Sequence, residues 1–180
     1  MREPVDAGKV RRFFREFGRR VDGPGRVYVT GGGSAVLIGW RHSTIDLDLK
    51  FDPEPPGAFE ALPRLKEELG INIELAAPDQ FIPPVPGWRE RSRFVERQGK
   101  VDFFHYDFLG QALSKVERGH EQDLKDVREM LARNLVTAAE MKRAFEELRR
   151  DLGRYPALDA ASFQRKVGRA LADFERGRKG

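Results

Sequence analysis

The sequence contains no cysteine, so disulfide bonds, thiolate zinc sites and cysteine nucleophiles are all excluded. This absence favours oxygen-ligated metals, among them Mg²⁺. The chain also has no run of about 18 apolar residues that would cross a bilayer. Met1-Arg2-Glu3-Pro4 begins no hydrophobic stretch of the kind found in signal peptides. We therefore expect a cytoplasmic protein without a membrane partner.

Neither sign of charge dominates the chain. The formal net charge is +4 over 180 residues, of which 39% are hydrophobic and 34% are charged. This balance is typical of a folded, soluble protein with one main core. The positive excess would attract a polyanion such as RNA or a nucleoside triphosphate (NTP) at long range. A solvated basic surface without a specific partner explains the same charge equally well.

The first part of the chain predicts a helix, a strand, a glycine turn and a second helix. Residues 6–20 carry an apolar stripe at helical spacing, with Asp6 at the capping position. Residues 27–29 form a short β-type run that stops at three glycines, residues 31–33. Residues 34–40 are then apolar enough for a buried helix.

The rest of the chain predicts short strands and then helices. We expect strands at residues 44–51, 71–75 and 101–106, a short helix at 63–69 ended by Gly70, and mostly loop at 78–99 with a strand at its end. Further helices are expected from Asp107 to Arg118, through Leu124, Val127 and Leu131 to Asn134, from the capping box Thr137–Glu140 to Leu152, and from Asp159 onward.

A strand that runs through glycines into a helix predicts an anion site, because free amide groups and the positive end of the helix dipole meet there. Ser34, near the capping position, adds a hydroxyl for a phosphate oxygen. A tight turn that merely needs glycine is the competing interpretation. The P-loop pattern is absent, and the dinucleotide fingerprint fails because Val36 stands in place of its third glycine.

Asp46 and Asp48 share one face of the predicted strand, about 7 Å apart along the chain by strand rise. Because like charges repel, a divalent cation held between them would make this arrangement favourable. Glu74 lies on the polar face of the next predicted strand and can join them. Asp102 is its rival for the place of third carboxylate, since it too alternates with apolar neighbours. An exposed edge strand with solvated acids is the competing interpretation of the aspartates.

The order of these motifs resembles a known enzyme family. Gly32-Gly33-Ser34 followed by Asp46-Leu47-Asp48, with twelve positions from Ser34 to Asp46, is similar to the signature of polymerase β-type nucleotidyltransferases. The wider string, which includes Gly39-Trp40-Arg41 and Thr44-Ile45, resembles the AbiE-type and MenT-like toxin nucleotidyltransferases of bacterial toxin–antitoxin systems. Those families place a lysine and then a charged Asp-x-x-Asp segment further along the chain, and Lys115 with Asp123-Leu124-Lys125-Asp126 fits this order.

The resemblance implies a polymerase β-like α+β fold, in which a small mixed sheet is flanked by helices. The predicted division is a nucleotidyltransferase core with its N-terminal helix, residues 1–106, and a C-terminal helical region packed on it, residues 107–180. The implied catalytic residues are Asp46, Asp48, Glu74, Lys115 and Asp123; the implied nucleotide-binding residues are Gly32, Gly33, Ser34, Arg41 and Lys115. Asp46, Asp48 and Glu74 would hold one or two Mg²⁺ ions, with Mn²⁺ as an alternative. An exposed helix lysine is the competing interpretation of Lys115, and the three histidines are interpreted as ordinary polar residues.

The function implied by the resemblance is transfer of a nucleoside monophosphate from an NTP to an acceptor hydroxyl. The candidate acceptors are a tRNA 3′ end and a protein, and a toxin with a cognate antitoxin is one expected setting. Three other classes stay open. A metal-dependent nuclease would use the same acids without NTP, a nucleotide- or RNA-binding module would release no pyrophosphate, and a structural partner protein would not depend on Asp46 and Asp48.

Overall fold

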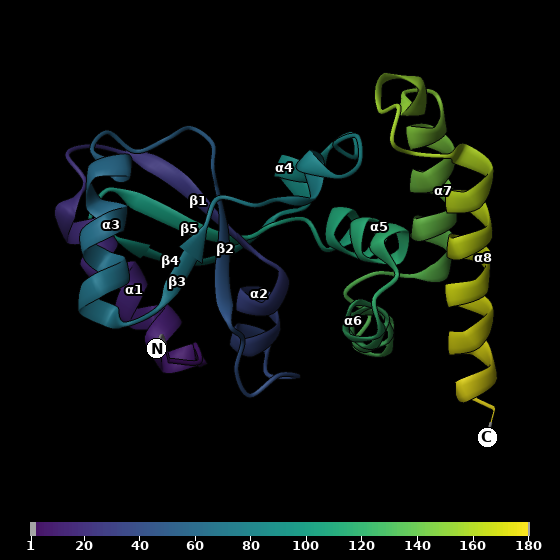
Figure 1. Ribbon diagram of the computed structural model, residues 1–180, viewed down its shortest axis with the longest axis horizontal. Coiled ribbons are helices and arrows are strands. Elements are labelled where there is room, and N and C mark those ends of the chain that lie inside the picture. Colours follow the sequence, from purple (N-terminus) through teal and green to yellow (C-terminus); the bar gives the residue numbers. More distant parts are fainter. Residues whose placement is uncertain (1–2, 180) are drawn as a thin grey trace. The chain divides into compact units, whose positions relative to one another are not determined.

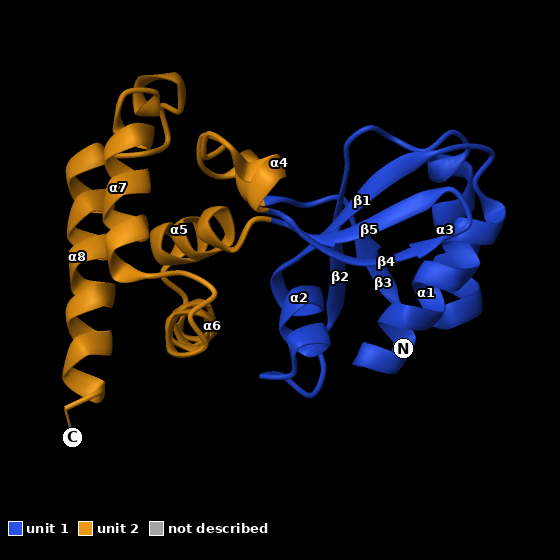
Figure 2. Cartoon of the chain, turned by 180° about the vertical axis from the view of Figure 1, so that it is seen from behind, with its two compact units in different colours: residues 1–77, 92–106 blue, residues 78–91, 107–180 orange. Residues whose placement is uncertain are grey.

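The computed structural model describes residues 3–179, which form two compact units (Figures 1 and 2). Unit 1 comprises residues 1–77 and 92–106, and unit 2 comprises residues 78–91 and 107–180. Residues 78–91 group with the C-terminal helices in unit 2, whereas the sequence-based division, which stays a prediction, placed them in the core. Among the described residues, no helix is both long enough and apolar enough to cross a membrane.

Unit 1 contains a five-stranded mixed sheet and three helices. In chain order its elements are α1 (Ala7–Arg20), β1 (Gly25–Thr30), α2 (Gly31–Ile38), β2 (Asp46–Phe51), α3 (Ala58–Leu69), β3 (Asn72–Glu74), β4 (Arg93–Gln98) and β5 (Val101–His105). The strand order is β3-β2-β1-β5-β4. β1 pairs in parallel with β5 and β2 with β3, whereas the β1–β2 and β4–β5 pairs are antiparallel. The expected α+β architecture with a small mixed sheet is confirmed.

One face of this sheet forms the core together with α1 and α3. The apolar residues that alternate along β1, β2 and β5 are buried in one cluster with the stripes of the two helices. Phe14 of α1 stacks on Phe103 of β5, with ring centroids 4.0 Å apart. Alternation therefore turns the opposite face of the sheet, which carries the predicted acids, away from this core.

Unit 2 is helical. Its elements are two 3-10 helices, η1 (Pro78–Gln80) and η2 (Leu152–Arg154), and five α-helices, α4 (Trp88–Arg91), α5 (Phe108–Arg118), α6 (Glu121–Ala132), α7 (Ala138–Arg149) and α8 (Ala160–Gly177). The predicted caps are confirmed: Asp107 accepts hydrogen bonds from two amides of α5, Thr137 and Glu140 form the capping box of α7, and Asp159 caps α8.

Two helix boundaries differ from the sequence-based expectation. α3 begins at Ala58, so that Pro63 lies inside it. The apolar face that this helix buries through Leu62 and Leu65 offsets the backbone hydrogen bond that proline removes. α2 begins at Gly31, three residues earlier than expected, and the glycines therefore form its first turn in place of a loop before it.

Candidate active site

The three glycines at the start of α2 each meet a different steric demand. Gly31 has a φ of +58°, in the left-handed region that favours glycine. A Cβ atom at Gly32 would lie 2.0 Å from Thr44 Oγ1, and one at Gly33 would lie 2.6 Å from the side chain of Val29. Glycine is thus required here to bring α2 close against β1 and the segment before β2.

The start of α2 faces the acids of β2. A Cβ atom at Gly31 would lie 3.0 Å from Asp48 Oδ2, so the carboxylate contacts the first turn of the helix directly. Thr30, at the N-cap of α2, is also the register partner of Asp48 across β1 and β2. The Thr30 side chain makes no capping hydrogen bond. The amide-rich helix start and the Asp48 carboxylate therefore lie side by side within unit 1.

Ser34 points into the protein. Its side chain is fully buried, and its hydroxyl donates to the Val29 carbonyl oxygen at 3.0 Å. The same hydroxyl lies 3.0 Å from His105 Nδ1, and because its single proton goes to Val29, the imidazole is the donor of that second bond. The phosphate-binding role expected of the Ser34 hydroxyl would require this side chain to turn outward, whereas the backbone amides of the turn need no such change.

His105 is the polar residue that the sequence-based interpretation undervalued. Its ring is buried on the core face of β5, and burial lowers its pKa to about 4, with the charges of Arg93 and Arg11 as further causes. The neutral ring then supports the first turn of α2 through Ser34. The signal was present in the sequence, because His105 continues the two-residue alternation of Val101 and Phe103 on the core face.

The predicted acids lie on one face of two neighbouring strands. In the parallel register of β2 and β3, Asp46 is opposite Asn72 and Asp48 is opposite Glu74. Asn72 Nδ2 donates to Asp46 Oδ1 at 2.7 Å and to Glu74 Oε1 at 2.8 Å. An uncharged amide therefore holds the two carboxylates together. The sequence signal for Asn72 is its place two residues before Glu74, on the same face of the strand.

The acids carry hard oxygen donors, which suit Mg²⁺ or Mn²⁺. Asp46 and Asp48 are two residues apart on one face and are only half-buried, so their carboxylates are open to a cation and its waters. Within residues 3–179, however, no three histidine, aspartate or glutamate side chains gather closely enough to form a complete ligand set. The position of Asn72 between Asp46 and Glu74 explains why Glu74 does not close such a set. The carboxylates of Asp46 and Asp48 therefore suit a divalent cation. Glu74 lies on the neighbouring strand but does not complete a ligand set with them.

Asp102, the rival third carboxylate, belongs to another part of the sheet. Its register partner on β1 is Arg26, four residues from Thr30, which places it roughly 13 Å along the strand from the level of Asp48. Arg97 binds its carboxylate through two hydrogen bonds, of 2.6 and 2.8 Å. This hydrogen bonding lowers the pKa of Asp102. Asp102 is thus an ion-pair residue away from the other acids.

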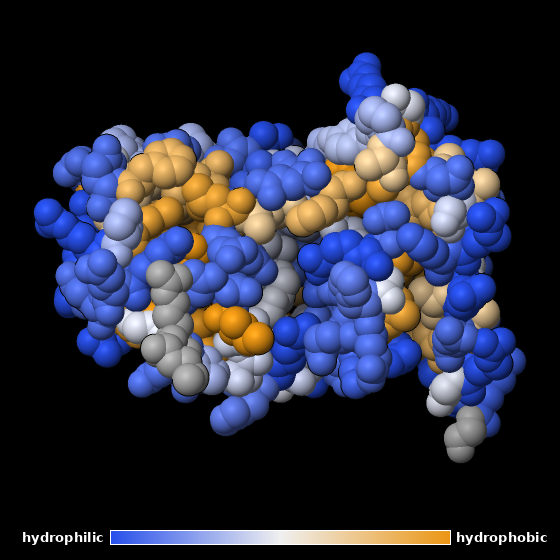
Figure 3. Space-filling model, viewed as in Figure 1, coloured by the Kyte–Doolittle hydropathy of each residue, from blue (hydrophilic) through white to orange (hydrophobic). Residues whose placement is uncertain are grey.

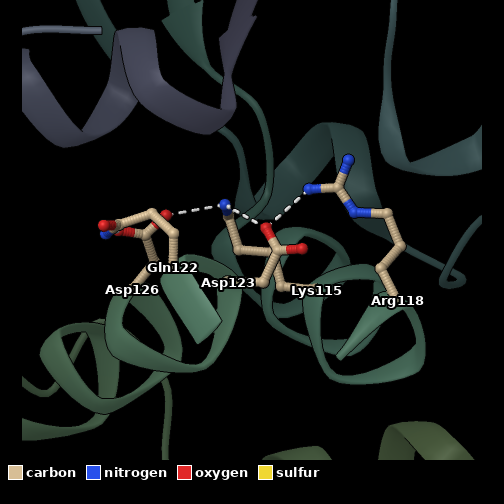
Figure 4. A network of polar contacts seen from close by, with 5 residues as sticks. All are labelled: Lys115, Arg118, Gln122, Asp123 and Asp126. Atoms are coloured by element: carbon tan, nitrogen blue, oxygen red, sulfur yellow. Dashed lines mark hydrogen bonds and ion pairs between the residues drawn. The ribbon is translucent and has the colours of Figure 1, made fainter. Parts of the chain in front are cut away.

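Lys115 and Asp123 lie in unit 2, within a group of charged residues that we term the ion network (Figure 4). Its members are Lys115 and Arg118 of α5 and Gln122, Asp123 and Asp126 of α6. Lys115 Nζ lies 2.7 Å from Asp126 Oδ2 and 3.2 Å from Asp123 Oδ1. Arg118 donates to Asp123 at 2.7 Å, and Gln122 donates to Asp126 at 3.3 Å. Two cations thus match two carboxylates.

Lys115 is not the exposed helix lysine of the competing interpretation, and its contact with phosphate stays a prediction. Its residue is only 4% exposed, and Asp123 and Asp126 are also buried. The network joins α5 to α6 and leaves Lys115 with its charge balanced by two carboxylates. The remaining predicted residue, Arg41, lies just after α2 in unit 1, half-buried, with its amide bonded to the Ala35 carbonyl at 3.4 Å.

A surface hollow of about 450 Å³ opens beside the acids of unit 1. Glu3, Asp46 and Asn72 form its polar wall, and Pro4 and Ile45, the latter with 79% of its surface exposed, form an apolar one. A polar wall with carboxylates and an apolar wall beside it can accommodate the sugar or base of a bound nucleotide.

Comparison with protein families places the chain in a known family. The model of the family described as "Nucleotidyltransferase of unknown function (DUF6036)" matches residues 12–167. This range includes the glycine turn, the acids of β2 and β3 and the ion network. No curated protein and no solved structure matches the chain.

Proposed function

The chain belongs to this nucleotidyltransferase family, and from that premise we propose that it transfers a nucleoside monophosphate from an NTP to an acceptor hydroxyl in a Mg²⁺-dependent reaction on a polymerase β-like fold. The observation that carries the proposal is the contact between the Asp48 carboxylate and the first turn of α2. It supports a site in which the acids face the same bound triphosphate as the amides of that turn.

Asp46 and Asp48 would bind the cation directly. Glu74 would bind it through a water molecule, or directly once its hydrogen bond to Asn72 is broken. A cation held there would supply the charge that neutralises the triphosphate and polarises the α-phosphate, where the acceptor oxygen would bond as the bond to the leaving pyrophosphate breaks. The amides of residues 31–33 would hold phosphate oxygens, because a helix N-terminus offers unpaired donors and a positive dipole end. The protein's part in catalysis is therefore positioning and charge stabilisation.

Asn72 acts in this proposal as a positioning residue. Its amide holds Asp46 and Glu74 within hydrogen-bonding reach of one nitrogen. The two acids thereby keep their orientation when the cation leaves, and their mutual repulsion is reduced. Partners of this kind set the geometry of metal-binding carboxylates.

The acceptor and the biological setting belong to the proposal as well. The acceptor is an RNA 3′ hydroxyl, with tRNA as the main candidate, or a protein hydroxyl. The resemblance to AbiE-type and MenT-like enzymes supports a toxin role with a cognate antitoxin. The positive net charge of +4 favours a polyanionic acceptor.

The test compares Asp46→Asn and Asp48→Asn with the wild-type protein and with Asp102→Asn, which makes the same change on the same sheet away from the site. Each protein is incubated with α-labelled NTP, Mg²⁺, total RNA and lysate protein. We expect label transfer and pyrophosphate release from the wild type and Asp102→Asn, and a loss of at least about 10²-fold in the other two.

The same reaction separates the competing classes of function. RNA degradation without NTP would identify a nuclease, and NTP binding without pyrophosphate release would identify a binding module. Full label transfer by Asp46→Asn and Asp48→Asn would remove these residues from the mechanism.

A further inference from the structure

The sheet face that carries the acids also carries aromatic side chains. The surface seen in Figure 3 is mostly hydrophilic, with separate apolar patches. Among the large hydrophobic residues that are exposed, Phe94 of β4 has 58% of its surface accessible. In the strand register, Phe94 is opposite Phe104 of β5, which is opposite Tyr28 of β1. We term Phe94, Phe104 and Tyr28 the aromatic row.

The rings of the aromatic row contact one another. Phe94 meets Phe104 edge to face, with centroids 5.7 Å apart, and Tyr28 stacks on Phe104 at 5.3 Å. The guanidinium of Arg26 lies 5.7 Å from the centroid of the Phe104 ring, and the Arg26 side chain is exposed. Tyr28 is buried and Phe104 is half-buried, so Phe94 offers the accessible ring, held in place by the other two and with the Arg26 cation beside Phe104.

The aromatic row leads to the acids. Tyr28 is opposite Lys50 of β2, and Lys50 lies two residues from Asp48 on the same face. Three strand spacings separate Phe94 from Lys50, a distance of about 14 Å. A chain whose reactive end lies at Asp48 would need only a few nucleotides to reach Phe94 within the same unit.

The charges beside the row suit a polyanion. The carboxylate of Asp102, which neighbours Arg26 in the register, is held by Arg97 through two hydrogen bonds and does not repel phosphates as a bare acid would. Arg26 adds a positive charge beside Phe104. Stacked rings with adjacent arginines bind single-stranded nucleic acid, whose bases stack on the rings while its phosphates meet the cations.

Resting on the proposed function, we propose that the acceptor is a single-stranded RNA end that lies on this sheet face, with a base stacked on the exposed Phe94 ring and a phosphate at Arg26. The surface provides binding and orientation for the acceptor, and the chemistry remains at the acids. An exposed aromatic patch of this kind also fits a protein partner, which the experiment below distinguishes.

The test measures RNA affinity without NTP or metal, so that it does not depend on the transfer reaction. A fluorescein-labelled, single-stranded RNA of mixed sequence is titrated with the wild type, Phe94→Leu, Phe94→Tyr and Phe59→Leu. Leucine keeps an apolar side chain but removes the π face, and tyrosine keeps both. Phe59 of α3 is the matched control, a phenylalanine with 52% of its surface exposed. Near-ultraviolet circular dichroism checks the fold of each variant.

We expect Phe94→Leu to weaken RNA binding about tenfold, and Phe94→Tyr and Phe59→Leu to bind like the wild type. Arg26→Gln should reduce the slope of log affinity against log salt by about 1. Equal affinity of Phe94→Leu and the wild type, an unchanged salt slope in Arg26→Gln, or a wild type that binds no RNA would each overturn the inference. If Phe94→Leu does not fold, the salt dependence of RNA affinity in Arg26→Gln tests the inference by itself.

Failure of the proposed function gives a different result. In that case a fluorescent NTP analogue with Mg²⁺ would not bind to the wild type, and no label would be transferred, whatever the RNA titration shows. Transfer of label to lysate protein, together with no affinity for RNA, would keep the enzyme and remove the RNA surface.

Discussion

The two units each contain a cluster of acidic side chains, and the clusters differ in how their charge is balanced. In unit 2, Asp123 and Asp126 are buried and paired with Lys115 and Arg118. In unit 1, Asp46 is half-buried, Glu74 is exposed, and an uncharged amide joins them. Buried acids with matching cations are typical of structural networks, whereas accessible acids joined through an amide retain charge for a ligand. From this comparison we propose catalysis at the acids of the sheet and a stabilising role for the ion network.

The sharpest test of this comparison removes the cation at the centre of the ion network. Lys115→Met should destabilise unit 2 by about 3–5 kcal/mol, because two buried carboxylates lose their shared partner. Urea unfolding followed through Trp88, which lies in unit 2, measures this in a Trp40→Phe background. Lys125→Met, which removes the exposed partner of Glu121, should cost less than about 1 kcal/mol. A stable Lys115→Met protein with a raised KM for NTP would contradict the structural role and support the predicted contact of Lys115 with phosphate.

His105 tests the support beneath the glycine turn. Its pKa is about 4 in the folded protein, against 6.5 for an ordinary histidine. Between these values the unfolded chain binds more protons than the folded one, so the stability due to neutral His105 is complete above about pH 6.5 and is lost as the pH falls towards 4. The expected loss is of the order of 3 kcal/mol.

The matching variant is His105→Asn, in which the side chain does not titrate. Unfolding curves at several pH values between 4 and 7 should show a flatter dependence for this variant than for the wild type. Identical slopes for the two proteins would show that His105 is protonated alike in both states, contrary to the burial argument.

Asn72 gives the smallest expected effect. Asn72→Ala removes the amide between Asp46 and Glu74, and loss of such an orienting partner typically costs about 10- to 100-fold in metal affinity or activity. The Mg²⁺ concentration for half-maximal label transfer should rise accordingly. Gln98→Ala, which removes an amide bonded to Glu96 on β4, is the control and should leave the half-maximal Mg²⁺ concentration unchanged. An unaltered Mg²⁺ dependence in Asn72→Ala would show that Asn72 does not orient the metal-binding acids.

Most of the fold follows from local patterns in the sequence. Alternation along residues 44–51 and 101–106 places the strands and their buried faces, and the caps Asp107, Thr137 and Asp159 place the helix starts. These signals are local because a cap needs only its own first turn and a strand face needs only alternation. The start of α2 was missed because Gly31–Gly33 favour turns until packing against Thr44 and Val29 makes glycine necessary.

The sequence predicts the acids of the candidate site, but it does not predict the side chains to which they are hydrogen-bonded. Asp46, Asp48 and Glu74 share a face by period alone, and the register confirms that face. The bond from Asn72 to Asp46, the inward turn of Ser34 and the burial of Lys115 depend on neighbours distant in sequence, which no local pattern encodes.

We propose above all that Asp46 and Asp48 together hold a divalent cation beside the first turn of α2. Electron paramagnetic resonance of Mn²⁺ measures this directly, in the presence of a non-hydrolysable NTP analogue, for the wild type, Asp46→Asn, Asp48→Asn and Asp102→Asn. We expect the wild type and Asp102→Asn to bind Mn²⁺ alike, and each of the other two to bind at least about tenfold more weakly. Equal Mn²⁺ affinity in all four proteins would contradict the claim.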